Sequence, residues 1–68
     1  MDAATFEMVL TAYEETCGDA RAQGQSEAVA HKEGLTAAAM CLAAMTGIED
    51  AAARAEVERL DLAKQLAA

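Results

Sequence analysis

The chain has 68 residues, of which 54% are hydrophobic, but 19 of these hydrophobic residues are alanine. A chain of this length forms at most one small domain and buries only about 60% of its unfolded surface, which excludes large enzyme folds. Twelve acidic and five basic residues give a net charge of −7, which opposes direct binding to nucleic acid and to anionic lipid.

The composition predicts an all-α fold, because the chain has no proline and no run of alternating β-branched residues. In the first segment, apolar residues recur at spacings of three and four: Phe6, Leu10, Tyr13 and Cys17. This spacing predicts a helix over residues 3–23, capped by Asp2 or Thr5. Gly18 lies inside this pattern and is a candidate position for a kink.

Two further helices follow from the signals for helix ends. Ser26 can cap a second helix over residues 27–46, and Gly47 suits the left-handed conformation that ends a helix. Acidic residues then favour the start of a third helix over residues 50–66. We therefore expect a single three-helix domain that spans residues 1–68.

The expected core consists of the larger apolar side chains on the inner faces of these helices: Phe6, Leu10, Tyr13, Leu35, Leu42, Val57 and Leu60. In the third helix, Ala53 and Ala67 extend this inner face, whereas Leu62 is expected to lie to one side of it. Such a core is thin for a small domain, and chains of this kind usually need a staple or a partner.

The second helix is the most informative element, because Thr36 is its only polar side chain between Leu35 and Met45. A helix that is apolar on all sides is usually buried on all sides. Two other helices cannot easily cover it, so we expect a homo-oligomer, most simply a dimer that packs as a helical bundle. The expected interface consists of small residues and one methionine edge: Ala30, Gly34, Ala37, Met40, Cys41 and Ala44.

Catalytic and metal-binding patterns are weak in this sequence. His31 is the only histidine, and Glu27 lies one turn before it, but di-iron bundles use the spacing Glu-x-x-His and two copies of it. Cys41 and Met45 could offer sulfur to copper, although both are ordinary fillers of apolar helix faces. We therefore expect no enzyme activity, no metal and no cofactor.

The net charge is concentrated at the amino terminus, where residues 1–20 contain five acids and no base. Four of these acids form the predicted partner-binding acidic face: Glu7, Glu14, Glu15 and Asp19. Such a face can attract a basic surface on another protein, or it can simply keep the protein in solution.

These features favour a small acidic protein-binding module without enzyme activity. Its size and charge are those of phage and mobile-element inhibitors that occlude a basic surface on a nucleic-acid-handling protein. The alternatives are a self-assembling structural subunit and a metal-binding helical protein that uses His31. The longest uncharged run is fifteen residues, which is too short to span a bilayer. A secretory signal begins with basic residues, whereas the first base in this chain is Arg21. We therefore expect a cytoplasmic location with no membrane contact.

Overall fold

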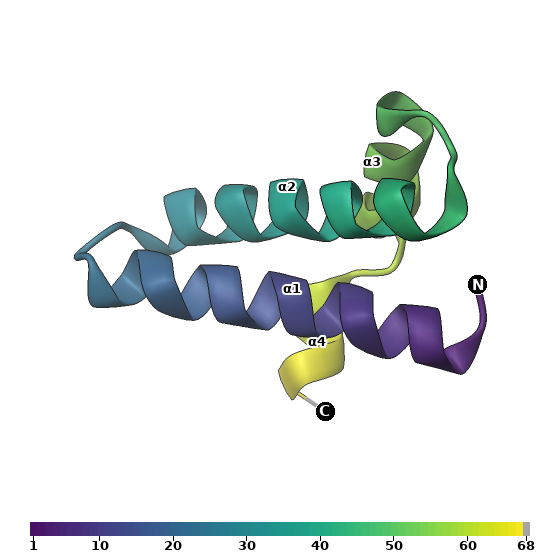
Figure 1. Ribbon diagram of the computed structural model, residues 1–68. Helices are drawn as coiled ribbons and strands as arrows, with labels where there is room; N and C mark the ends of the chain where they lie inside the picture. The colour runs from purple at the N-terminus through teal and green to yellow at the C-terminus, as the bar shows by residue number, and fades with distance from the viewer. Residues whose placement is uncertain (68) are drawn as a thin grey trace.

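The computed structural model describes residues 1–67, apart from the side chain of Ala67. The described residues form four helices and no strand (Figure 1). The helices are α1 (Ala3–Ala22), α2 (Glu27–Thr46), α3 (Asp50–Arg59) and α4 (Leu62–Ala67). The all-α class is confirmed, and the three expected helices become three main helices and a short fourth one.

The helix α1 follows the prediction closely at both ends. The Asp2 carboxylate accepts a hydrogen bond of 2.8 Å from the backbone N–H of Thr5, so Asp2 is the N-cap. This bond stabilises the ionised carboxylate and lowers the pKa of Asp2. The helix runs through Gly18 without a break and ends at Ala22, with Gln23 as its C-cap beside Gly24, which has a positive φ of 83°.

The helix α2 also has the predicted boundaries. Ser26 accepts a hydrogen bond from the backbone N–H of Val29 at 3.2 Å, which satisfies one of the free donors at the helix start. At the other end Gly47 adopts the left-handed conformation with φ 77° and donates its N–H to the carbonyl of Ala43. The chain then turns by 120° into α3.

The helices α1 and α2 run antiparallel and lie side by side (Figure 1). Gly34 of α2 faces Tyr13 and Cys17 of α1, and a Cβ atom on Gly34 would lie only 2.5 Å from the Cys17 sulfur. Ala30 is fully buried, and its carbonyl accepts a hydrogen bond of 3.3 Å from the Cys17 thiol. Small residues on α2 therefore allow a close approach of the two helices.

The expected third helix is interrupted, which corrects the prediction over residues 50–66. The helix α3 ends at Arg59, and Asp61 has a positive φ of 51°, a conformation that Asp tolerates better than most residues. In an unbroken helix the inner positions after Leu60 would be Ala63 and Lys64, and burying the Lys64 ammonium group would be unfavourable.

The interruption brings Leu62 into the core with no exposed surface, although the sequence pattern had placed it to one side. Leu60 is only half-buried, and Ala67, expected on the inner face, lies outside the described side chains. The helix α3 packs on α2, and α4 packs on α1. One side of the α1–α2 pair is thereby closed.

The rest of the predicted core is partly confirmed. Tyr13, Leu35, Leu42 and Val57 are buried, as is Ala53. Phe6 and Leu10 are half-buried at the edge of the core. Val9, which is not in the expected core, is fully buried, so the inner face of α1 is broader than predicted.

Two glycines inside helices give a matched test of the close contact between α1 and α2. Gly34→Ala should lower the free energy of unfolding by about 1 to 3 kcal/mol, because the new methyl group meets Cys17 and Tyr13 in the core. Gly18→Ala meets nothing within 4 Å and should raise stability by up to about 1 kcal/mol through helix propensity. Urea denaturation measures both changes, and a Gly34→Ala protein as stable as the parent would contradict this packing.

Candidate functional site

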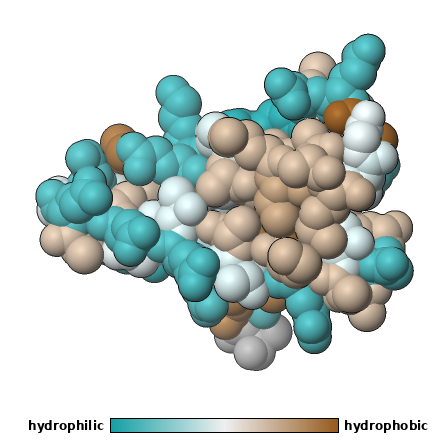
Figure 2. Space-filling model, in the orientation of Figure 1, coloured by the Kyte–Doolittle hydropathy of each residue, from teal (hydrophilic) through white to brown (hydrophobic). Residues whose placement is uncertain are grey.

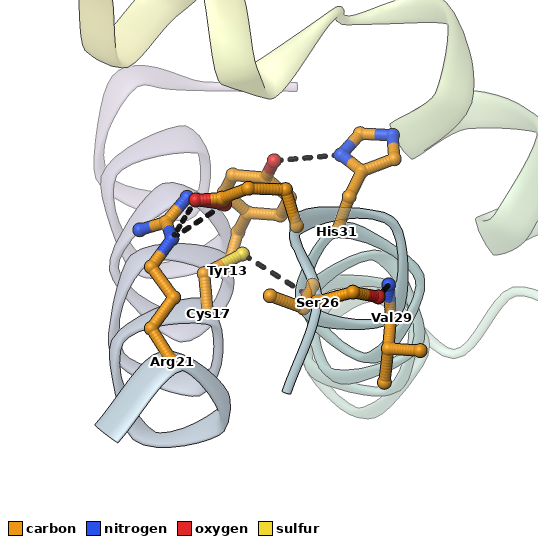
Figure 3. A network of polar contacts seen from close by, with 8 residues as sticks. Tyr13, Cys17, Arg21, Ser26, Val29 and His31 are labelled. Atoms are coloured by element: carbon orange, nitrogen blue, oxygen red, sulfur yellow. Dashed lines mark hydrogen bonds and ion pairs between the residues drawn. The ribbon is translucent and has the colours of Figure 1, made fainter. Parts of the chain in front are cut away.

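Polar contacts join α1 to the amino-terminal half of α2 (Figure 3). The Tyr13 hydroxyl lies 2.7 Å from Nδ1 of His31, and the two rings meet edge to face. About two turns further along α1, Arg21 forms an ion pair with Glu27 at 2.7 Å. Glu27 is thus the partner of Arg21, and the ring of His31 is positioned by Tyr13.

Burial raises the pKa of Tyr13 to about 12, so its hydroxyl remains protonated at neutral pH. The hydroxyl of Tyr13 and Nδ1 of His31 therefore share a hydrogen bond in which the tautomer of the His31 ring decides the donor. No sequence pattern indicates this pair, because the two residues are 18 positions apart and lie on different helices. The contact between Tyr13 and His31 becomes visible only when the alignment of α1 with α2 is known.

This pair does not extend into a metal site within residues 1–67. No three His, Cys, Asp or Glu side chains in that range come together in a group that could hold a metal ion. Tyr13 and His31 instead connect two packed helices, which is a structural arrangement.

A second feature is a shallow groove on the opposite side of the α1–α2 pair from α3 and α4. Its volume is about 520 Å³. It is lined by Ala4, Glu7, Met8, Thr11, Ala12 and Glu15 of α1 and by Cys41 of α2. We refer to these seven residues as the α1–α2 groove. Its floor is apolar, and two carboxylates stand at its edges.

Figure 2 shows the apolar surface around this groove as a broad light-brown area. The area covers the amino-terminal half of α1 and the carboxyl-terminal half of α2, which lie together at the same end of the pair. Three methionines contribute exposed apolar side chains on these two helix halves: Met8, Met40 and Met45. The end that holds the turn between α1 and α2 is hydrophilic by comparison.

The residues of the expected oligomer interface differ in their exposure in the folded chain. Ala30 and Gly34 are buried inside the single chain against α1, which leaves them almost no exposed surface for a second copy. Ala37 and Cys41 are half-buried, whereas Met40 and Ala44 are exposed. The first two lack exposed surface because α1 of the same chain packs on this row of small residues.

The four residues of the acidic face are all exposed, but they surround the outer side of α1 rather than forming one cluster. Glu7 and Glu15 border the α1–α2 groove, and Asp19 lies one turn beyond Glu15. Glu14 lies on another side of α1, in a hollow shared with Leu66 of α4. Within the described part of the chain, none of the four carboxylates forms an ion pair.

No protein-family model, curated protein or solved structure matches this chain. Among the described residues, no single helix is long and apolar enough to cross a membrane. The helices α2 and α3 reach that length and composition only when they are taken together, with the 120° bend between them.

The Tyr13 hydroxyl gives a pH-dependent prediction. Because folding raises the pKa of Tyr13 from about 10 to about 12, its contribution to stability is complete below pH 10 and is lost as the pH rises to 12. Tyr13→Phe should therefore have a flatter stability profile between pH 10 and 12 than the parent protein. Urea denaturation across this range measures both profiles, and parallel profiles would contradict the burial of the hydroxyl.

Proposed function

We propose that this protein is a non-enzymatic binding module that docks on a basic surface of another protein. The observation that carries the proposal is the position of Glu7 and Glu15 beside an uncovered apolar floor that contains Met8 and Cys41. An apolar area with a polar rim is the usual composition of a protein–protein interface.

The charge distribution supports a basic partner. Arg21 is the only base on α1, and it is already paired with Glu27. Five uncompensated acids in residues 1–20 create a negative field that accelerates the approach of Lys- and Arg-rich surfaces. Surfaces that bind nucleic-acid phosphates are of this kind, so a nucleic-acid-handling protein is the class of partner that we propose.

The apolar contact supplies the other part of the binding energy. Met8 is 54% exposed, and a methionine side chain adapts its shape to different partners because it is unbranched and flexible. Burying such a side chain contributes roughly 1.5 to 3 kcal/mol, more than an exposed ion pair usually does. In this proposal the carboxylates guide association, and the methionine and alanine surface determines how long the complex lasts.

Self-association is a second candidate function, favoured by the exposed side of α2. Met40 is 66% exposed, and Ala44 and Met45 beside it are exposed as well. A second copy seated on this edge would cover apolar surface that α3 leaves open. It would also bring two chains of charge −7 together, which weakens this candidate at low salt.

The first test uses the triple variant Glu7→Gln, Glu14→Gln, Glu15→Gln, immobilised beside the parent protein in a cell lysate. The parent should capture proteins with basic surfaces at about 50 mM salt and release most of them at about 300 mM, because screening shortens the reach of exposed charges. The triple variant should capture much less, and mass spectrometry of the eluted proteins measures the difference.

A control with the same change of net charge separates position from total charge. It carries three exposed acids changed elsewhere in the chain: Glu33→Gln, Glu49→Gln and Asp61→Asn. This control should behave as the parent does. Equal capture by the parent and by both variants would show that the acidic face only keeps the protein in solution.

The second test concerns self-association and uses Ala44→Glu, which places a charge on the exposed edge of α2 without disturbing the core. If a second copy covers this edge, the parent should sediment as a dimer at tens of micromolar and Ala44→Glu as a monomer. A parent protein that sediments as a monomer at that concentration would contradict self-association.

A further inference from the structure

We infer that the α1–α2 groove is a receptor site for an amphipathic helix of a partner protein, with Lys or Arg beside the apolar stripe of that helix. This inference rests on the proposed function and specifies where the partner binds and what chemistry it presents.

The groove is the uncovered side of a two-helix pair whose other side is already closed by helices. The chain passes behind α1 on its way to α4 in the view of Figure 1, and the same view of the surface in Figure 2 faces the open side. An antiparallel helix pair offers a depression on each side, and a helix is the element that fills it in helical bundles. On the closed side α3 and α4 have this role.

The dimensions of the groove suit a helix of about three turns. The α1 residues that line it extend from Ala4 to Glu15, which corresponds to about 18 Å along the helix axis. Ala4, Met8 and Ala12 follow one another at a spacing of four and form a continuous apolar row on α1. Small side chains on both sides of Met8 leave room for the side chains of an approaching helix.

The rim determines the charge of the occupant. Glu7 and Glu15 stand at the edges of the apolar floor, and neither has an ion-pair partner among the described residues. A helix with Lys or Arg flanking its apolar stripe would place cations next to both carboxylates. A second copy seated groove to groove would instead bring like charges together, so a basic partner fits this site better.

The test uses a synthetic amphipathic peptide of about 16 residues, built from leucine on one stripe and lysine beside it. Two control peptides define the chemistry: one keeps the leucine stripe and replaces lysine with glutamate, and one keeps the composition but scrambles the stripe. Fluorescence anisotropy at about 50 mM salt measures the affinity of each peptide. The basic amphipathic peptide should bind, and both controls should bind at least about tenfold more weakly.

A matched pair of methionine variants locates the binding site. Met8→Gln changes the floor of the groove, whereas Met40→Gln changes a somewhat more exposed methionine outside it, next to α3. Both substitutions preserve side-chain length and helix propensity. Met8→Gln should weaken binding of the basic peptide at least about fivefold, and Met40→Gln should change it less than about twofold.

The two cysteines provide an independent footprint. Cys41 lies in the groove and is half-buried, whereas Cys17 is buried with 1% exposed surface. Bound peptide should slow the alkylation of Cys41, while Cys17 should remain unreactive in the folded protein with or without peptide.

The outcomes separate this inference from the proposed function. Binding that weakens with Met40→Gln but not with Met8→Gln, with no protection of Cys41, would overturn the groove as the site and leave a basic partner in place. Equal binding of the lysine and glutamate peptides would overturn the basic partner itself. No binding of the basic peptide, together with capture of basic proteins by the parent in the lysate experiment, would overturn only the helical occupant.

Discussion

The close contact of Gly34 with Cys17 and Tyr13 is the constraint on which the rest of the molecule depends. With no side chain at Gly34, α2 approaches α1 closely enough for the Cys17 thiol to reach the carbonyl of Ala30. The same approach brings the Tyr13 hydroxyl within 2.7 Å of His31. The alignment of the two longest helices, and therefore the shape of both sides of the pair, follows from this contact.

The helices α3 and α4 cover only one side of the α1–α2 pair, and our proposal depends on the side that they leave open. The chain has few large apolar residues, and two of those near its end, Val57 and Leu62, are fully buried on the side that α3 and α4 close. The open side carries alanine and methionine, which are less unfavourable in water than leucine or isoleucine would be. A small domain can therefore remain folded with an apolar area available for a partner, which is the arrangement that our proposal uses.

The boundaries of α1 and α2 could be predicted because their end signals are local. Asp2, Ser26 and Gly47 each act on backbone groups within a few residues, and each has the expected role. The break near Asp61 could not be predicted from such signals, because no glycine or proline marks it. It follows from tertiary packing, which favours a buried Leu62 over a continuous helix.

The candidate site could be predicted only in part. The exposure of Glu7, Glu14, Glu15 and Asp19 followed from the sequence pattern, but their separation to different sides of α1 depends on where α2 and α4 pack. Likewise, the row of small residues on α2 was recognised, but whether its partner was α1 or a second copy could not be decided from the sequence. The groove itself combines residues about 30 positions apart and becomes visible only when the two helices are aligned.

The exposure of the methionine methyl groups to a soluble paramagnetic agent tests the central claim, an open apolar groove on the folded chain. With carbon-13 labelled methyl groups, we predict a strong paramagnetic relaxation enhancement for the methyl resonances of Met8 and Met40 in the free protein. The methyl resonances of buried Leu62 should show little enhancement. These values should not change with protein concentration in the low micromolar range. A Met8 methyl group as protected as those of Leu62 would contradict the account, because the groove would then already be covered.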